Sequence, residues 1–106
     1  MGYRGALALF ASAGVLAAGA AHAQDARALQ VASLAATCAN CHGTQGKPVA
    51  GSPLPALAGM PKDAMLASLR GFKDGSRPAT IMHQLTKGYS DAQLEQIATY
   101  FAGQPR

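Results

Sequence analysis

The sequence CANCH, Cys38 to His42, contains the only two cysteines of the 106-residue chain, followed at once by a histidine. A disulfide between Cys38 and Cys41 would close a very small loop and remove little entropy from the unfolded chain. A zinc site would want a second pair of ligands, but after residue 23 the chain has no further cysteine and only one other histidine, His83. A thiol–disulfide redox pair is typical of a βαβ setting, and the sequence has no strand-like alternation.

The remaining interpretation of CANCH is the attachment pattern of a c-type haem. Two thiols three residues apart at a helix end can both reach one edge of a porphyrin and form thioethers, and the imidazole of the next residue is then held beneath the iron. We therefore predict one covalent haem c bound through Cys38 and Cys41, with His42 as an iron ligand.

The rest of the chain is consistent with a need for such a group. Large apolar side chains are sparse and tryptophan is absent, and a domain this small usually needs a disulfide, a metal or another cross-link to be stable. Residues 43–61 contain four glycines and four prolines and fit no regular element, and a long loop in a compact domain is usually functional. A haem would give the core an apolar disc and the loop a surface to wrap around.

The first residues predict export to the periplasm. Met1–Arg4 carries one positive charge, residues 6–19 are apolar, and Ala21 and Ala23 are the small residues that signal peptidase requires. We expect residues 1–23 to be a cleaved signal peptide and residues 24–106 to be one mature domain. An uncleaved anchor is the alternative, but the apolar run is shorter than the roughly 20 residues of a spanning helix. We expect no membrane span in the mature form.

Helix signals predict an all-α fold of three or four short helices and one Gly/Pro-rich loop. The expected helices cover residues 25–37, 61–73, 78–87 and a last one between Ser90 and Gly103. Asp25 is the expected cap of the first helix, Pro61 suits the first turn of the second, and Ser90 with Gln93 forms a capping box for the last.

The segment PALAG, residues 55–59, follows the cysteine motif at a suitable distance. An iron-bound histidine usually donates its Nδ1–H to a carbonyl or carboxylate, which fixes the ring. The carbonyl of Pro55 is the expected acceptor for His42, and Leu57 is expected to pack on the ring.

With these motifs the sequence resembles the small class I cytochromes c over essentially the whole mature chain. A closer likeness is to the cytochrome subunit of flavocytochrome c sulfide dehydrogenase and to half-domains of related dihaem cytochromes. CANCHGTQG, LRGFKDGSRPATIM and KGYSDAQLEQIATYFA carry this likeness. Flavocytochrome subunits often have two such halves, whereas this chain has one CxxCH.

The resemblance implies that Met82 is the sixth ligand of the iron, opposite His42. Met65 lies in an expected helix, where methionine is more often core filler, and Met60 is too close to PALAG to reach the opposite face of the disc. His83 is the rival, but adjacent helical side chains diverge by about 100°. We expect Met82 to bind the iron, and His83 to lie at the surface or near the propionates.

The function that the resemblance implies is one-electron transfer, as the electron-accepting subunit or partner of a sulfide-oxidising flavoprotein. The chain would then be an electron carrier, at most the cytochrome subunit of an enzyme complex. A free periplasmic shuttle is an alternative, as is a haem enzyme or ligand-binding protein with a labile sixth ligand. The mild positive charge of the chain could steer it to an acidic partner. It could equally keep the domain soluble or offset the negative charge of the haem propionates. The candidate propionate partners are Arg77, Lys87 and Tyr89. Nothing indicates nucleic acid.

Overall fold

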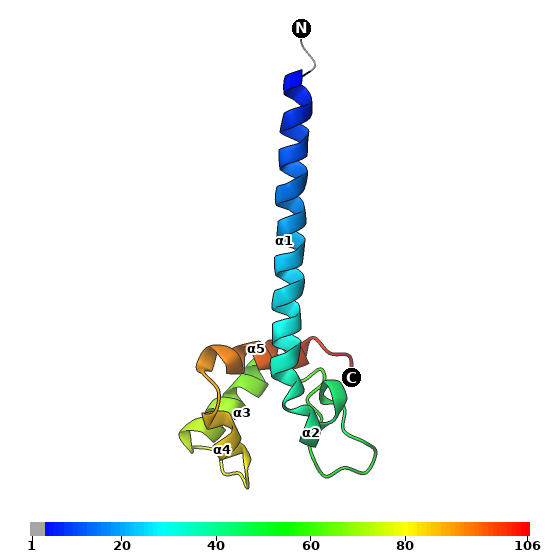
Figure 1. The fold of residues 1–106 in the computed structure, drawn as a ribbon. Coiled ribbons are helices and arrows are strands. Elements are labelled where there is room, and N and C mark those ends of the chain that lie inside the picture. The colour runs from blue at the N-terminus through cyan, green and yellow to red at the C-terminus, as the bar shows by residue number, and fades with distance from the viewer. Residues whose placement is uncertain (1–3) are drawn as a thin grey trace. The chain divides into compact units, whose positions relative to one another are not determined.

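The computed structural model describes the backbone of residues 4–106 and the side chains of residues 19–106. The described residues form helices and loops, with no strand, as expected for an all-α protein. The elements are α1 (Arg4–Ala36), α2 (Ala39–His42), the 3₁₀ turn η1 (Thr44–Gly46), α3 (Lys62–Asp74), α4 (Met82–Lys87) and α5 (Asp91–Ala102) (Figure 1).

Helix α1 differs from the expected first helix. The chain divides into one unit that ends at Gln30 and a second unit, Val31–Arg106, so α1 contributes only its last turns to the second unit. The helix runs through Asp25, which therefore cannot cap it, and the prediction of a start at residue 25 is wrong. Alanine and other good helix formers precede Asp25, and nothing among them stops a helix.

The expected signal peptide, residues 1–23, lies within the first unit. Part of its charged start, residues 1–3, lies outside the described residues, and cleavage after Ala23 stays a prediction. None of the helices in the described part of the chain has the length and apolar character needed to cross a bilayer.

The core of the second unit lies between α1, α3 and α5. Helix α3 packs against both α4 and α5. The buried side chains come from the inner faces of three helices: Ala35, Met65, Leu66, Leu69, Leu94, Ile97, Ala98 and Phe101. The second expected helix is correct to within a residue or so, since Pro61 precedes α3 and Gly75 ends it in the left-handed conformation.

The expected capping box at the start of α5 is present. Ser90 Oγ accepts a hydrogen bond from the backbone N–H of Gln93 at 3.2 Å, and Gln93 Oε1 accepts one from the backbone N–H of Ser90 at 2.8 Å. Both bonds satisfy donors that a helix N-terminus leaves free.

Helix α4 begins at Met82, four residues later than expected. The backbone N–H of Arg77 donates to the carbonyl of Gly71 at 2.9 Å, which holds the chain against the end of α3. Thr80 and Ile81, both β-branched, follow, and Ile81 has non-helical φ and ψ of −135° and −27°. The helix that Pro78 would have allowed therefore starts only after the non-helical Ile81.

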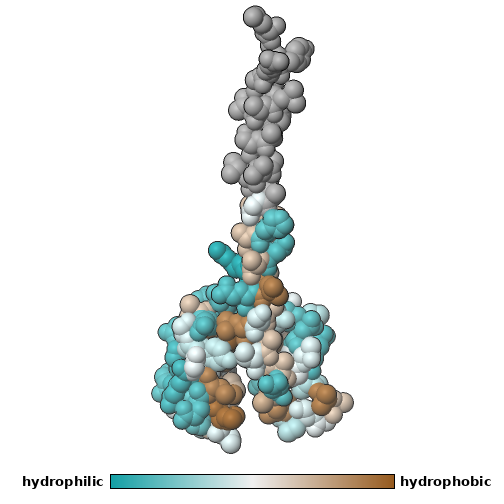
Figure 2. Space-filling model, in the orientation of Figure 1, coloured by the Kyte–Doolittle hydropathy of each residue, from teal (hydrophilic) through white to brown (hydrophobic). Residues whose placement is uncertain are grey.

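The Gly/Pro-rich loop is anchored at two points. The carbonyl of Gly46 accepts from the backbone N–H groups of Leu57 at 2.8 Å and Ala58 at 3.1 Å, and the N–H of Gly59 donates to the carbonyl of Phe101 at 2.9 Å. Within the second unit, Figure 1 shows α2 and this loop on one side and α3 with α4 on the other. The space-filling view shows the surface hollowed between these two sides (Figure 2); we call this feature the hollow.

Candidate cofactor site

The two cysteines lie at a short helix beside the hollow. Cys38 is the N-terminal cap of α2, and its carbonyl accepts from the backbone N–H groups of Cys41 and His42. Cys38 is partly buried and Cys41 is exposed. Burial raises the pKa of the Cys38 thiol above its ordinary value, against a smaller lowering by its hydrogen bond with Thr37. The two thiols lie one helical turn apart, a spacing at which both can reach one edge of a porphyrin.

His42 is buried and held in a fixed orientation. Only 8% of its surface is exposed, and its Nδ1 lies 2.8 Å from the carbonyl oxygen of Pro55. Because a carbonyl can only accept, Nδ1 carries the hydrogen, and Nε2 is left as the nitrogen with a free lone pair. This is the arrangement that iron-binding histidines use.

The two loop residues of the predicted site have different surroundings. Pro55 is exposed and supplies its carbonyl to His42. Leu57 is partly buried, packs against the core cluster, and is tied to Gly46 through its backbone N–H. The loop thus connects the imidazole of His42 to the core.

Met82 and His83 are adjacent in α4 but have different environments. Met82 is partly buried against the core cluster, which Cys38 also contacts. His83 instead lines an open pocket of about 360 Å³, together with residues from the end of α3 that include Phe72 and Arg77. The Nδ1 atom of His83 is buried and has no hydrogen-bond partner within the described part of the chain.

The other candidate residues are also placed. Met65 is 3% exposed in the core and Met60 is packed at its edge. The Arg77 guanidinium carbon lies 4.9 Å from the centre of the Phe72 ring, and Lys87 lines the same open pocket. The phenol of Tyr89 is 2.7 Å from the hydroxyl of Thr37, so in this structure its polar end is bonded to another side chain.

Thr86 is one of the most buried residues, at 1% exposed, and no sequence motif marks it. Its hydroxyl donates to the carbonyl of Met82 at 2.8 Å. The available signal was its position, four residues after Met82, where a threonine can bond back along a helix.

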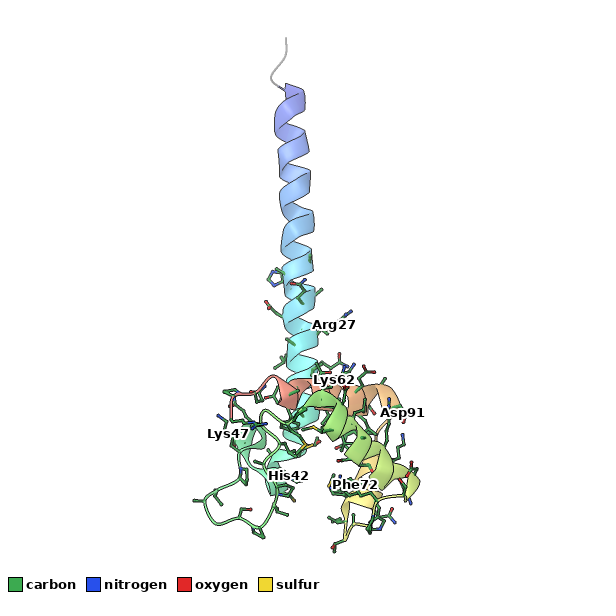
Figure 3. All side chains as sticks on the ribbon, turned by 180° about the vertical axis from the view of Figure 1, so that it is seen from behind. Arg27, His42, Lys47, Lys62, Phe72 and Asp91 are labelled. Atoms are coloured by element: carbon green, nitrogen blue, oxygen red, sulfur yellow. The ribbon has the colours of Figure 1, made fainter. Side chains whose placement is uncertain are left out.

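The walls of the hollow suit a flat apolar group. Figure 3 labels His42 on one side and Phe72 on the other. Four large apolar side chains from these two sides are exposed: Val49, Leu54, Ile81 and Leu85. Two thiols and a histidine nitrogen lie within residues 38–42, and this donor set matches a covalently attached, iron-containing porphyrin. The residues present therefore fit haem c.

Fold and site together define a c-type haem protein. In agreement with this, the family model "Cytochrome c" matches residues 17–104. The chain belongs to the cytochrome c family and carries covalent haem c at Cys38 and Cys41. Electron transfer is the function of this family.

Several curated proteins are similar to the chain. The cytochrome subunit of sulfide dehydrogenase from Chlorobaculum tepidum is 38% identical over 64% of this chain and 60% of its own length. The thiosulfate dehydrogenase electron acceptor from Thiomonas intermedia is 41% identical over 64% of this chain and 31% of its own length. Cytochrome c4 from Pseudomonas aeruginosa is 41% identical over 81% of this chain and 42% of its own length. The chain therefore spans between about a third and three fifths of these relatives.

Proposed function

We propose that this protein is a monohaem electron carrier whose iron is bound by His42 and Met82 and which accepts electrons from a sulfide-oxidising flavoprotein. The observation that carries the proposal is the divergence of Met82 and His83. Met82 faces the core cluster that Cys38 also contacts, whereas His83 faces an open pocket at the end of α3. This difference in environment supports Met82, and not His83, as the second iron ligand beside His42.

The chain's own residues set the redox behaviour of the site. The haem supplies a reversible one-electron couple at its iron. The Pro55 carbonyl holds the His42 ring and its tautomer, and a methionine sulfur favours a higher reduction potential than a second histidine would. If His42 and Met82 both bind the iron, substrate would have no place to bind it, and electron transfer would be the remaining chemistry.

The surface around the hollow suits contact with another redox protein. Val49 and Leu54 expose apolar area on one side and Ile81 and Leu85 on the other, and Lys47 and Lys87 lie on the same segments. Exposed apolar area bordered by charge is typical of an interaction site, and lysines raise the rate of encounter with an acidic partner. We infer that the donor docks here through an acidic surface.

The choice of donor rests on the relatives. One is a subunit of sulfide dehydrogenase and another is an electron acceptor of thiosulfate dehydrogenase, so a dehydrogenase of reduced sulfur is the common element. We favour the sulfide-oxidising flavoprotein, with a free periplasmic shuttle as the alternative. Gel filtration of a native periplasmic extract separates the two, because a subunit elutes with a larger flavin-containing partner and a shuttle elutes alone near its monomer mass.

The ligand assignment is tested by absorption spectra of the wild type, Met82→Ala and His83→Ala. Oxidised haem with bound methionine sulfur has a weak far-red charge-transfer band, which should vanish in Met82→Ala and persist in His83→Ala. Loss of the band in His83→Ala alone would overturn the assignment. A high-spin oxidised wild type that binds carbon monoxide rapidly when reduced would instead support a ligand-binding haem protein.

The periplasmic location belongs to the same proposal. We infer that residues 1–23 are removed on export, and N-terminal sequencing of the haem-containing protein should then begin at Gln24. A haem-containing form that begins at Met1 would contradict this.

A further inference from the structure

A chain of hydrogen bonds connects the residue before Cys38 to Met82. The hydroxyl of Thr37 lies 2.7 Å from the phenol oxygen of Tyr89, across 52 residues of sequence. The backbone N–H of Tyr89 donates to the carbonyl of Thr86 at 3.2 Å. The hydroxyl of Thr86 in turn donates to the carbonyl of Met82 at 2.8 Å.

Two further contacts fix the Tyr89 end of this chain. Lys73 donates to the backbone carbonyl of Tyr89 at 2.8 Å and to Oδ1 of Asp91 at 2.8 Å. The Tyr89 ring packs against the core cluster. The corner between α4 and α5 is therefore tied to α3, to the core and to the cysteine segment.

The Thr86 hydroxyl has a specific place in this arrangement. A threonine inside a helix that bonds back to the carbonyl four residues earlier does not stabilise the helix, and it often bends it. Thr86 is nevertheless one of the two buried polar side chains of the described residues, the other being His42. The Thr86 hydroxyl donates to the carbonyl of Met82 itself. We therefore expect Thr86 to help orient Met82.

We propose that Thr37, Tyr89 and Thr86 act as positioning residues that hold Met82 against the haem iron, and we call this set the clamp. The proposal rests on the proposed function, in which Met82 is the sixth ligand. The clamp fixes the distance between the cysteine segment, to which the haem is attached, and α4, which supplies the sulfur. Opening the clamp makes the iron–sulfur bond easier to displace, and the protein becomes more accessible to other iron ligands.

The test is the affinity of the oxidised protein for imidazole, which competes with Met82 for the iron. Tyr89→Phe and Thr37→Val each remove a hydroxyl and retain the shape of the side chain. A hydrogen bond between neutral groups contributes about 0.5–1.5 kcal/mol, so each variant should bind imidazole about two- to tenfold more tightly and have a weaker far-red band. Thr37→Val also removes the 2.8 Å bond from the Thr37 hydroxyl to the Leu34 carbonyl. The double variant should therefore bind imidazole about as tightly as Thr37→Val alone, since Tyr89→Phe removes no bond that Thr37→Val leaves in place.

Matched variants separate positioning from general stability. Tyr100→Phe removes a phenol hydroxyl from α5 and should leave the imidazole affinity unchanged. Thr86→Ser keeps the hydroxyl and should retain wild-type affinity, whereas Thr86→Val should not. If Tyr89→Phe and Thr37→Val lower the unfolding midpoint but leave imidazole affinity unchanged, or if their effects on affinity simply add, the clamp is wrong.

The same measurements distinguish failure of the clamp from failure of the ligand assignment. Met82→Ala should lose the far-red band and bind imidazole more tightly than any clamp variant. If Met82→Ala keeps the far-red band, Met82 is not the iron ligand, and both the ligand assignment and the clamp are wrong. If Met82→Ala loses the band while Tyr89→Phe behaves as the wild type, only the clamp falls.

Discussion

The imidazole of His42 and the backbone carbonyl of Pro55 form a 2.8 Å hydrogen bond between residues 13 apart in the chain. A bond from Nδ1–H makes the opposite ring nitrogen a more basic ligand, which favours the oxidised form of the iron. Proline restricts the backbone from which this carbonyl projects.

The first prediction concerns that restriction. Pro55→Gly keeps the carbonyl but frees the backbone, so the protein should lose about 0.4–1 kcal/mol of stability and its reduction potential should rise as the bond to His42 weakens. Pro53→Gly frees the same loop without touching His42 and should leave the potential unchanged. Equal potentials in the two variants, measured by redox titration, would show that the Pro55 bond does not tune the site.

The second prediction concerns Gly46, where η1 meets the loop. Gly46 has a φ of +77°, and an added Cβ would lie 2.8 Å from both the Ala58 nitrogen and a Phe101 ring carbon. Gly51 has a similar φ of +82° but has no atom within 4 Å of its Cβ position. Both alanine variants place a side chain in a left-handed conformation, at about 1–2 kcal/mol, but only Gly46→Ala also overpacks the core, at about 1–3 kcal/mol more.

Thermal unfolding of the haem-containing protein distinguishes these two variants. At about 4–8 °C per kcal/mol for a domain of this size, the midpoint of Gly46→Ala should fall clearly below that of Gly51→Ala. Equal unfolding midpoints in the two variants would mean that the loop at Gly46 can move away from Phe101 without loss of stability.

The third prediction concerns the two thioether positions. Cys38→Ser and Cys41→Ser should each retain one covalent bond to haem, and the double variant none. Mass spectrometry under denaturing conditions should therefore detect the haem adduct on both single variants and not on the double one. Ala39→Ser, in the same helix, should keep the full adduct, and a persistent adduct on the double variant would refute attachment at these cysteines.

The fourth prediction concerns acid stability. The hydrogen bond and charge of Lys73 lower the pKa of Asp91 below its ordinary value of 3.8. In the window between the two values the unfolded chain binds more protons than the folded one, so stability from this pair is present above pH 3.8 and is lost as the pH falls through the folded pKa.

In Asp91→Asn the free energy of unfolding should therefore fall less steeply as the pH drops below 3.8. Its pH dependence at higher pH should be unchanged. Glu95→Gln should act in the same direction, because Lys62 lowers the pKa of Glu95 in the same way. The measurement is urea unfolding at a series of pH values from pH 6 to pH 2.5. The variants are compared by how their free energy of unfolding changes with pH, not by its absolute value. If both variants lose stability at acid pH as steeply as the wild type, these exposed ion pairs do not contribute to acid stability.

The parts of the fold that were predictable are those with local causes. The capping box of Ser90 and Gln93 joins residues three apart, and Pro61 and Gly75 act on the helix they border. The cysteine motif is local too, since its spacing alone indicates the cofactor. The expectation that Met82 and His83 would diverge follows from helix geometry, and their different environments agree with it.

The parts that were not predictable depend on distant partners. Arg77 bonds to Gly71 ahead of the late start of α4, and no pattern in residues 78–81 signals that contact. Thr37 and Tyr89 are 52 residues apart, so neither attracts attention alone. The start of α1 was missed for the opposite reason, because Asp25 has the chemistry of a cap but lies within a continuous helical segment.

The exposed apolar side chains at the rim of the hollow have a consequence for production of the protein. Until haem fills the hollow, its walls are uncovered, and the exposed side chains of Val49, Leu54, Ile81 and Leu85 beside it add to the apolar surface through which haem-free chains can associate. Cells that make the polypeptide faster than they can supply and attach porphyrin should therefore accumulate it as insoluble aggregate, and a richer iron and porphyrin supply should move it into the soluble fraction.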